Sequence, residues 1–176
     1  PARKGWARQP DVVMTVVGPP DDNGFCCFGE ALWSKKDYCQ RARTVIVEVD
    51  NNQIRTFGDS YIHVSEIDCF VEHTPQEPSP LFKLADELRA FKPPEGTRRI
   101  AELVSSLIND GDTVQIGWSM NTMLFPWLGV FDNKQDLGWY SELTPPGITS
   151  LVKAGVFTGR RKSFHPGKAV CTCLFG

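Results

Sequence analysis

The sequence contains no apolar run of about 18 residues or more, and its 176 residues carry a formal net charge of only −2. A membrane-spanning helix is therefore not expected, and without a basic excess neither nucleic acid nor an anionic membrane is expected as the main partner. The first residues lack the apolar core of a signal peptide, which favours a cytoplasmic protein. They also lack an initiating Met, which suggests a processed chain or a fragment.

Cysteine is present, but not in the spacing of a zinc site. The pairs Cys26-Cys27 and Cys171-x-Cys173 do not match the CxxC pattern that holds zinc. Because the chain is not small and shows no secretory signal, a disulfide framework is not favoured either. We expect reduced, mostly buried thiols and no metal cofactor. The cysteines are Cys26, Cys27, Cys39, Cys69, Cys171 and Cys173.

Several common catalytic motifs are also missing. The sequence has no Gly-x-Ser-x-Gly, no GxGxxG and no P-loop ending in Gly-Lys-Ser/Thr. The three histidines are isolated, and His165, within Phe-His-Pro-Gly, is interpreted as a turn residue rather than a catalytic base. Asp21-Asp22 starts like a calcium loop but lacks the remaining ligands, so it is interpreted as turn chemistry.

The first part of the chain has the pattern of a βαβ unit. Residues 11–18 form an apolar, β-branched run that predicts a strand buried on both faces, and residues 44–49 form another such run. Residues 34–43 between them predict a helix, with Ser34 as the N-cap and Asp37 completing a capping box. Shorter strands are expected at 25–28, 61–64 and 67–72.

The second part alternates helix and strand after a proline-rich connection. Five prolines bracket a short helical pattern at 81–91, which predicts an inter-domain linker over residues 74–96. Beyond it, helices are expected at 100–108, 121–130 and 148–154, and strands at 113–117, 137–143 and 168–175. This alternation predicts an α/β fold with mostly parallel sheets flanked by helices.

Two segments of this second part are candidates for a site, because ligands of open α/β sheets bind beyond the carboxyl ends of the strands. Residues 117–121 form a small-residue turn between a strand and a helix, where backbone N–H groups attract anions. Glu142 lies among Trp139, Tyr140 and Leu143, where an acid is costly to bury unless it is used or paired. An ordinary turn and an exposed glutamate at a strand end remain the simpler alternatives. Similarly, Arg160-Arg161-Lys162 suggests a solvated loop, with a phosphate pocket as the alternative.

Read in order, the segments resemble the acetyl-CoA hydrolase/transferase family, which includes 4-hydroxybutyrate and butyryl-CoA:acetate CoA-transferases. Residues 17–29 resemble the family's SPPDxHGYxSxG segment, and residues 100–117 resemble IaxlIxDGaTLQlGiG. Residues 134–142 resemble kkDLGiHtEm. Further matches cover 42–51, 58–68, 155–162 and 165–168. The resemblance extends in order over nearly the whole chain.

This resemblance implies a class I CoA-transferase, built as two CoA-transferase-like (NagB/RpiA-like) lobes. Such enzymes move CoA between an acyl-CoA and a small carboxylate through a glutamyl-CoA thioester, and the motif glutamate matches Glu142. The glycine-rich turn of the family matches Gly117, Trp118, Ser119, Met120 and Asn121, which are expected to contact the substrate or CoA. No cofactor is implied beyond the CoA thioester substrate.

The sequence departs from the family pattern at several motif positions. Ser119 replaces the second glycine of the turn, Tyr140 replaces the histidine of HtEm, and Pro146 replaces an aspartate. A histidine of the first motif is replaced by Asn23. These changes keep two alternatives open, namely an acyl-CoA hydrolase and a non-catalytic CoA-binding subunit of a split enzyme.

Compared with the family, the chain looks like a middle portion. We expect the end of the first lobe at 1–73, the linker at 74–96 and the beginning of the second lobe at 97–176. A homo-oligomer, or an assembly with a chain that supplies the missing C-terminal half, is expected because a lone portion would expose strand edges. On this view, an inactive isolated chain is one of the expected outcomes.

Overall fold

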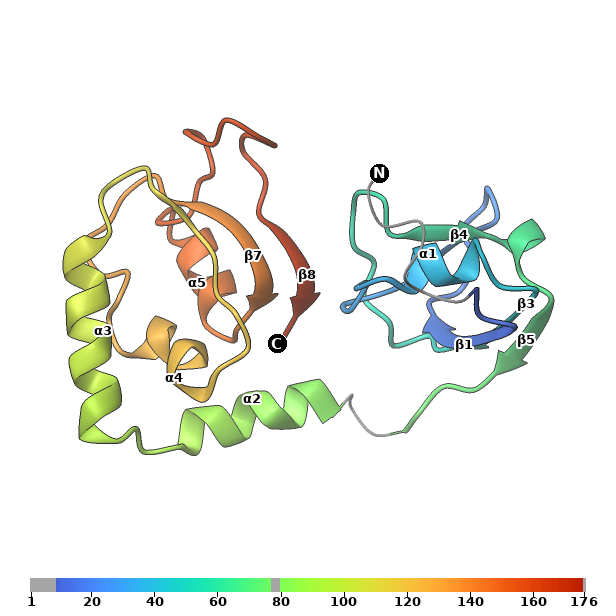
Figure 1. The fold of residues 1–176 in the computed structure, drawn as a ribbon, viewed down its shortest axis with the longest axis horizontal. Helices are drawn as coiled ribbons and strands as arrows, with labels where there is room; N and C mark the ends of the chain where they lie inside the picture. The colour runs from blue at the N-terminus through green and yellow to red at the C-terminus, as the bar shows by residue number, and fades with distance from the viewer. Residues whose placement is uncertain (1–8, 77–79, 176) are drawn as a thin grey trace. The chain divides into compact units, whose positions relative to one another are not determined.

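The computed structural model describes residues 9–76 and 80–175 of the chain. It divides into two compact units, residues 1–78 and residues 79–176, which are described separately below (Figure 1). The predicted lobe limits at 73 and 97 remain predictions. Among the residues that the structure describes, no helix combines the length and the apolar character needed to cross a membrane.

The first unit is built on a three-stranded parallel sheet. Its strands are β1 (Val12–Val17), β3 (Thr44–Val49) and β5 (Cys69–Glu72), in the order β1-β3-β5. The short helix α1 (Lys35–Cys39) lies in the connection from β1 to β3, as the βαβ pattern predicts. An antiparallel pair, β2 (Phe25–Cys27) and β4 (Tyr61–His63), and the 3-10 turn η1 (Val64–Glu66) complete the unit. The core consists of Val17, Cys26, Phe28, Cys39, Val45, Val47, Ile62 and Ile67.

Two predictions for this unit are wrong. Strand β1 is not buried on both faces, because Met14 is 76% exposed while Val17 is fully buried. The buried valines of this sheet belong to one cluster, so only one face of β1 is covered by the described residues. Helix α1 is shorter than residues 34–43, and Ser34 makes no side-chain cap. Its backbone (φ −104°, ψ 16°) lacks the extended conformation of a capping residue, and Asp37 instead faces Arg41 at 3.8 Å.

The second unit contains a parallel sheet with the order β6-β7-β8. Its strands are β6 (Thr113–Val114), β7 (Gly138–Thr144) and β8 (Val170–Leu174). Its helices are α2 (Pro80–Ala90), α3 (Glu95–Leu107), α4 (Met120–Met123), η2 (Phe125–Trp127, 3-10) and α5 (Ile148–Lys153). The core packs around Trp139 and Phe131 and also contains Ala101, Ile116, Phe125, Val130, Leu137, Ile148 and Phe157.

The elements of the second unit are confirmed, but most of their bounds differ from prediction, and three differences are instructive. Strand β6 ends at Val114 instead of residue 117. Beyond its end, the N–H and the carbonyl of Ile116 form hydrogen bonds with the Ser141 hydroxyl. The helix expected at 121–130 is interrupted into α4 and η2, and Pro126, which lacks an N–H, lies at the start of η2. Helix α3 begins at Glu95, directly after Pro94, and not at Ile100.

Candidate functional site

Glu142 lies on β7, and the alternation of that strand sets its direction. Trp139, Ser141 and Leu143 are buried, whereas Tyr140 is exposed and Glu142 is half-buried. Because successive side chains of a strand point to opposite faces, Tyr140 and Glu142 share the face opposite the core around Trp139. The sequence left two alternatives, a buried carboxylate and an exposed one at a strand end. The structure shows an intermediate case, a half-buried carboxylate within the strand.

The predicted turn lies directly against this carboxylate. A Cβ atom added to Gly117 would stand 3.3 Å from Oε2 of Glu142. Two segments that are 25 residues apart in the sequence thus meet, because β6 and β7 are parallel neighbours. Among the described residues, the Glu142 carboxylate has no hydrogen-bond or ion-pair partner. The side-chain amide of Gln115 also reaches this place, since its Nε2 would lie 3.9 Å from the same Cβ.

The remaining residues of the turn are held in different ways. Ser119 caps α4 by accepting a hydrogen bond from the Asn121 N–H at 3.3 Å. Asn121 in turn accepts a 2.7 Å bond from the Thr97 hydroxyl of α3, which fixes the turn to that helix. Met120 and Trp118 are exposed, and the Trp118 ring meets Phe175 edge-on at 5.5 Å.

The backbone at the start of the turn offers free donors. Within the part of the chain that the structure describes, the N–H groups of Gly117 and Trp118 donate to no acceptor. Such donors next to a carboxylate are suited to an oxyanion. The turn is therefore fixed by Thr97 and Ser119 at one end, while its first two N–H groups stay available.

Strand β8 supplies the other neighbour of Glu142. The register pairs Ser141 with Cys171 and Leu143 with Cys173, so Thr172 lies beside Glu142 on the same face. Thr172 is half-buried. Gly117 and Thr172 thus flank the carboxylate from the β6 and β8 sides, and the sequence analysis did not anticipate Thr172.

Lys162 is the charged residue that the sequence analysis missed. It was grouped with Arg160 and Arg161 as a solvated loop, but only 7% of Lys162 is exposed. Its ammonium donates to the carbonyls of Trp139 at 3.0 Å and of Lys168 at 2.7 Å. Burial lowers the pKa of Lys162 from its ordinary value of 10.5.

A glycine on β7 makes this close approach possible. A Cβ at Gly138 would lie 2.6 Å from Cγ of Lys162, so the lysine stem crosses the strand where there is no side chain. The sequence contained a signal for this contact, because a glycine stands four residues before Glu142 on β7. A strand glycine leaves room for a neighbouring side chain. Lys162 therefore fastens the segment before β8 to the strand that carries Glu142.

The first unit contains turn chemistry, as predicted for Asp21. Its carboxylate accepts the N–H groups of Asn23 at 3.0 Å and Phe25 at 2.9 Å and pairs with Arg55. The bond from Phe25, followed by those from Asn23 and Arg55, holds the pKa of Asp21 below its ordinary value of 3.8. No cysteine forms a disulfide in the part of the chain that the structure describes. The thiols of Cys26, Cys27, Cys39 and Cys173 are buried, as predicted, whereas Cys69 and Cys171 are exposed.

Comparison with solved structures defines the class of this fold. A 4-hydroxybutyrate CoA-transferase from Porphyromonas gingivalis matches with a TM-score of 0.78 and 26% identity, over 94% of this chain and 40% of that one. RipA from Yersinia pestis matches with a TM-score of 0.78 and 28% identity, over 94% and 36%. The fold is therefore that of part of a CoA-transferase.

Sequence comparisons give the family. Residues 4–82 match the acetyl-CoA hydrolase/transferase N-terminal domain. A 4-hydroxybutyrate coenzyme A transferase of Clostridium kluyveri is 40% identical over 94% of this chain, and a succinyl-CoA:cyclohexane-1-carboxylate CoA transferase of Geobacter metallireducens is 32% identical over 94%. Residues 4–82 are thus similar to a domain of the acetyl-CoA hydrolase/transferase family, and nearly the whole chain is similar to CoA-transferases. The chain spans 36% of the length of each of these two relatives.

Proposed function

We propose that this chain carries the nucleophile of an acyl-CoA:carboxylate CoA-transferase, and that Glu142 is that nucleophile. The observation that carries the proposal is the Glu142 carboxylate itself, which is half-buried, has no partner among the described residues and lies directly against Gly117. A partly desolvated carboxylate that is not neutralised by a neighbour keeps its nucleophilic oxygen available. The relatives named above are CoA-transferases, which supports this reaction class.

The chemistry proceeds in two exchanges. A Glu142 oxygen attacks the thioester carbonyl and expels the CoA thiolate, which leaves a mixed anhydride. The thiolate then attacks the glutamyl carbonyl, releases the first carboxylate and forms a glutamyl-CoA thioester. An acceptor carboxylate reverses both steps, regenerating Glu142 and a new acyl-CoA.

The turn would stabilise the charge that develops in these steps. Each attack places a negative charge on a carbonyl oxygen, and the free N–H groups of Gly117 and Trp118 are the donors nearest in sequence to the contact with Glu142. In this proposal Ser119 and Asn121 fix the turn, whereas Trp118 and Met120 form its exposed surface. The reaction needs no metal or prosthetic group.

Intact-mass analysis of the protein after mixing with butyryl-CoA tests this proposal. A covalent CoA adduct that peptide mapping assigns to Glu142 is expected, and added acetate should discharge it as acetyl-CoA. Glu142→Gln should abolish the adduct with the fold intact, because it removes the nucleophile and little volume. Glu87→Gln, on an exposed residue of α2, is the matched control.

The same experiment separates transfer from the alternatives. Discharge of the adduct by water at the same rate with and without acetate would indicate an acyl-CoA hydrolase. An adduct that persists in Glu142→Gln would exclude Glu142 as the nucleophile. A folded wild-type chain that forms no adduct would contradict the proposal for this chain.

We also propose that the chain acts in the cytoplasm and in an assembly, either with copies of itself or with a chain that completes the lobes. Exposed apolar side chains support the assembly, since Met14 on β1 and Leu107 on α3 are each 76% exposed. Sedimentation of the purified chain at several concentrations tests it. A monomer at every concentration, alone and with candidate partners, would contradict the proposed assembly.

A further inference from the structure

Tyr140 and Thr144 are the two side chains of β7 that lie two residues from Glu142, and of these Thr144 is buried whereas Tyr140 is exposed. Tyr140 and Glu142 are separated by Ser141, which points into the core. Two residues of a strand span about 6.6 Å, so the Tyr140 ring is in reach of a group bonded to the carboxylate. The ring is 41% exposed and is therefore available to a ligand on this face.

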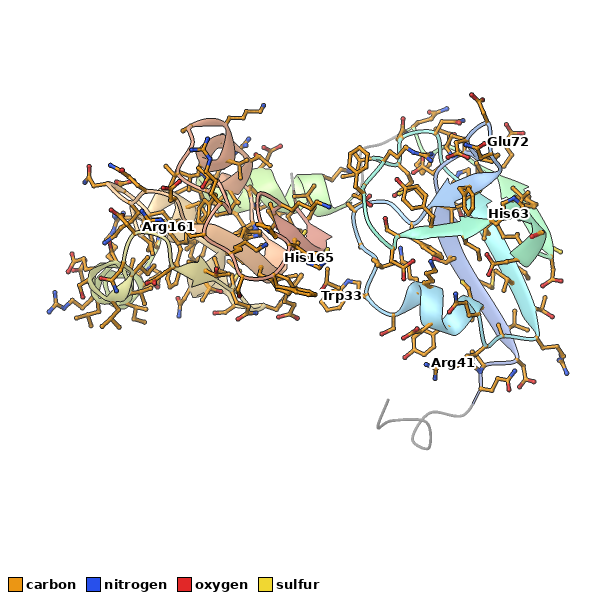
Figure 2. The ribbon with its side chains drawn as sticks, turned by 90° about the horizontal axis from the view of Figure 1, so that it is seen from above. Trp33, Arg41, His63, Glu72, Arg161 and His165 are labelled. Carbon is orange, nitrogen blue, oxygen red and sulfur yellow. The ribbon has the colours of Figure 1, made fainter. Side chains whose placement is uncertain are left out.

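The ring is held in place from the segment that precedes β8. His165 stacks on it with parallel planes (3°) at 6.1 Å between ring centroids, and Phe164 packs against His165 at 4.0 Å. The Lys162 ammonium lies 4.9 Å from the centre of the Tyr140 ring. We call Tyr140, Phe164 and His165 the aromatic shelf; Figure 2 labels His165 beside the strands of this unit.

The position of the shelf restricts which part of a substrate can touch it. In an acyl-CoA the nucleotide is separated from the thioester by the whole pantetheine arm, whereas the acyl group is bonded directly to the carbon that Glu142 attacks. A wall about two residues from the nucleophile therefore meets the groups next to the thioester, which are the acyl chain and the near end of the pantetheine arm. Of these two, the apolar acyl chain suits an aromatic surface better than the amide-containing arm does. The nucleotide end would lie too far away.

The chemistry of the shelf restricts the acyl group further. Phe164 is 62% exposed and Tyr140 is partly exposed, so the shelf offers aromatic ring surface. The nearby cation, Lys162, is buried, and its ammonium already donates to two backbone carbonyls. It is therefore a poor partner for a second carboxylate on the acyl chain. Aromatic surface favours an uncharged, apolar chain.

We propose that the aromatic shelf is the acyl-binding wall of this site and that Tyr140 determines its specificity for apolar acyl chains longer than acetyl. This inference rests on the proposed function, because it takes Glu142 as the point of attack. It makes the shelf a contact surface for the ligand, and Lys162 a residue that positions the shelf without touching the ligand.

Calorimetric binding of acetyl-, butyryl- and hexanoyl-CoA to a Glu142→Gln protein tests this, since no reaction can then interfere. Each added methylene should raise the affinity about twofold, roughly half the gain of complete burial. Tyr140→Ala in the same background should flatten this dependence while acetyl-CoA binds nearly as before. Tyr140→Phe, which keeps the ring, should retain it.

Two further variants keep the result interpretable. Phe164→Ala should weaken the dependence on chain length even if Tyr140→Ala fails to fold, because Phe164 is more exposed. Leu107→Ala, which removes an exposed apolar side chain of α3, should leave the dependence unchanged.

Failure of this inference differs from failure of the proposed function. The same rise in affinity per methylene in Tyr140→Ala, Phe164→Ala and the parent protein would overturn the acyl wall, even where wild type forms the Glu142 adduct. Absence of any dependence on chain length, or of binding, in the parent protein would also overturn it. The adduct assay on the wild-type chain then decides separately whether Glu142 reacts.

Discussion

The contact between Gly117 and Glu142 depends on the absence of a single methyl group. An alanine Cβ at position 117 would lie 3.3 Å from the carboxylate oxygen, closer than ordinary van der Waals contact. The carboxylate would have to shift by a few tenths of an ångström or rotate away. Small misplacements of a reacting group are costly to a rate, although they cost little in stability.

We therefore predict that Gly117→Ala slows formation of the Glu142 adduct about tenfold or more. Its free energy of unfolding should change by less than about 1 kcal/mol. Gly96→Ala on α3 is the control, because nothing lies within 4 Å of a Cβ there. Stopped reactions followed by intact mass, with urea unfolding of each variant, measure both quantities. Equal adduct rates in both variants would contradict the prediction.

Asp21 gives a prediction for acidic pH. Its pKa is lowered in the folded protein, so the stability that it contributes is complete above the ordinary value of 3.8 and is lost as the pH falls through the folded value. Asp21→Asn keeps an oxygen that accepts the N–H groups of Asn23 and Phe25 but removes the titration. The variant should thus lose less stability than wild type between neutral pH and strong acid. Asp22→Asn, at the neighbouring exposed residue, should behave as wild type, and identical acid profiles of all three proteins would exclude this role of Asp21.

Among the elements, β7 is held at its centre by a side chain as well as by the sheet. The Ser141 hydroxyl accepts the Ile116 N–H at 2.8 Å and donates to the Ile116 carbonyl at 3.0 Å, where the ladder of β6 has ended. Ser141→Ala would leave the Ile116 N–H without a partner in a buried place, while the Ile116 carbonyl would keep the Leu143 N–H at 3.3 Å. We predict a loss of about 1–3 kcal/mol in the free energy of unfolding. Ser150→Ala on the exposed side of α5 should change it little, and an equal effect of the two variants in urea unfolding would refute the bridge.

Lys162 connects β7 to the segment before β8, and its pKa gives a test at alkaline pH. Because the folded pKa lies below 10.5, the unfolded chain binds more protons between the folded value and 10.5. The stability of wild type should therefore rise with pH across that window, relative to Lys162→Met. Lys153→Met, at an exposed residue of α5, is the control. Parallel pH profiles of wild type and Lys162→Met would contradict this assignment.

The sequence predicts the elements better than their ends and their contacts. Apolar runs and helical spacing located β1, β3, β7, α2 and α5, because those patterns reflect local geometry. The exposure of Met14 and the end of β6 at Val114 depend on what packs beside each strand, which no local pattern contains.

The candidate site shows the same division. The motif resemblance pointed to Glu142 and the turn from Gly117, and the structure brings these together. Thr172 and Lys162 were not anticipated, because the register of β8 and a buried ammonium bound to carbonyls are tertiary features. Charge alone made Lys162 look like a solvated residue. Gly138, which leaves room for the Lys162 side chain, was the sequence signal that the prediction did not use.

On the scale of the whole chain, two compact units with separate cores predict two separable unfolding events. Val47 is fully buried in the first core, and Leu137 is fully buried in the second. Leu137→Ala should cost about 2–5 kcal/mol and shift only the transition reported by buried Trp139. Val47→Ala should shift only the other transition. Urea unfolding followed by tryptophan fluorescence and by far-UV circular dichroism measures both, and a single transition shifted by either variant would show one cooperative unit.

The burial of Lys162 has a chemical consequence if acyl thioesters bind here, as the proposed function requires. An amine with a lowered pKa is more often uncharged and is thus more easily acylated by a thioester nearby. Lys162 lies below the Tyr140 ring, yet only 7% of it is exposed and its nitrogen already donates to the carbonyls of Trp139 and Lys168. Under the proposed function, the fold therefore protects this lysine from acylation by the bound thioester.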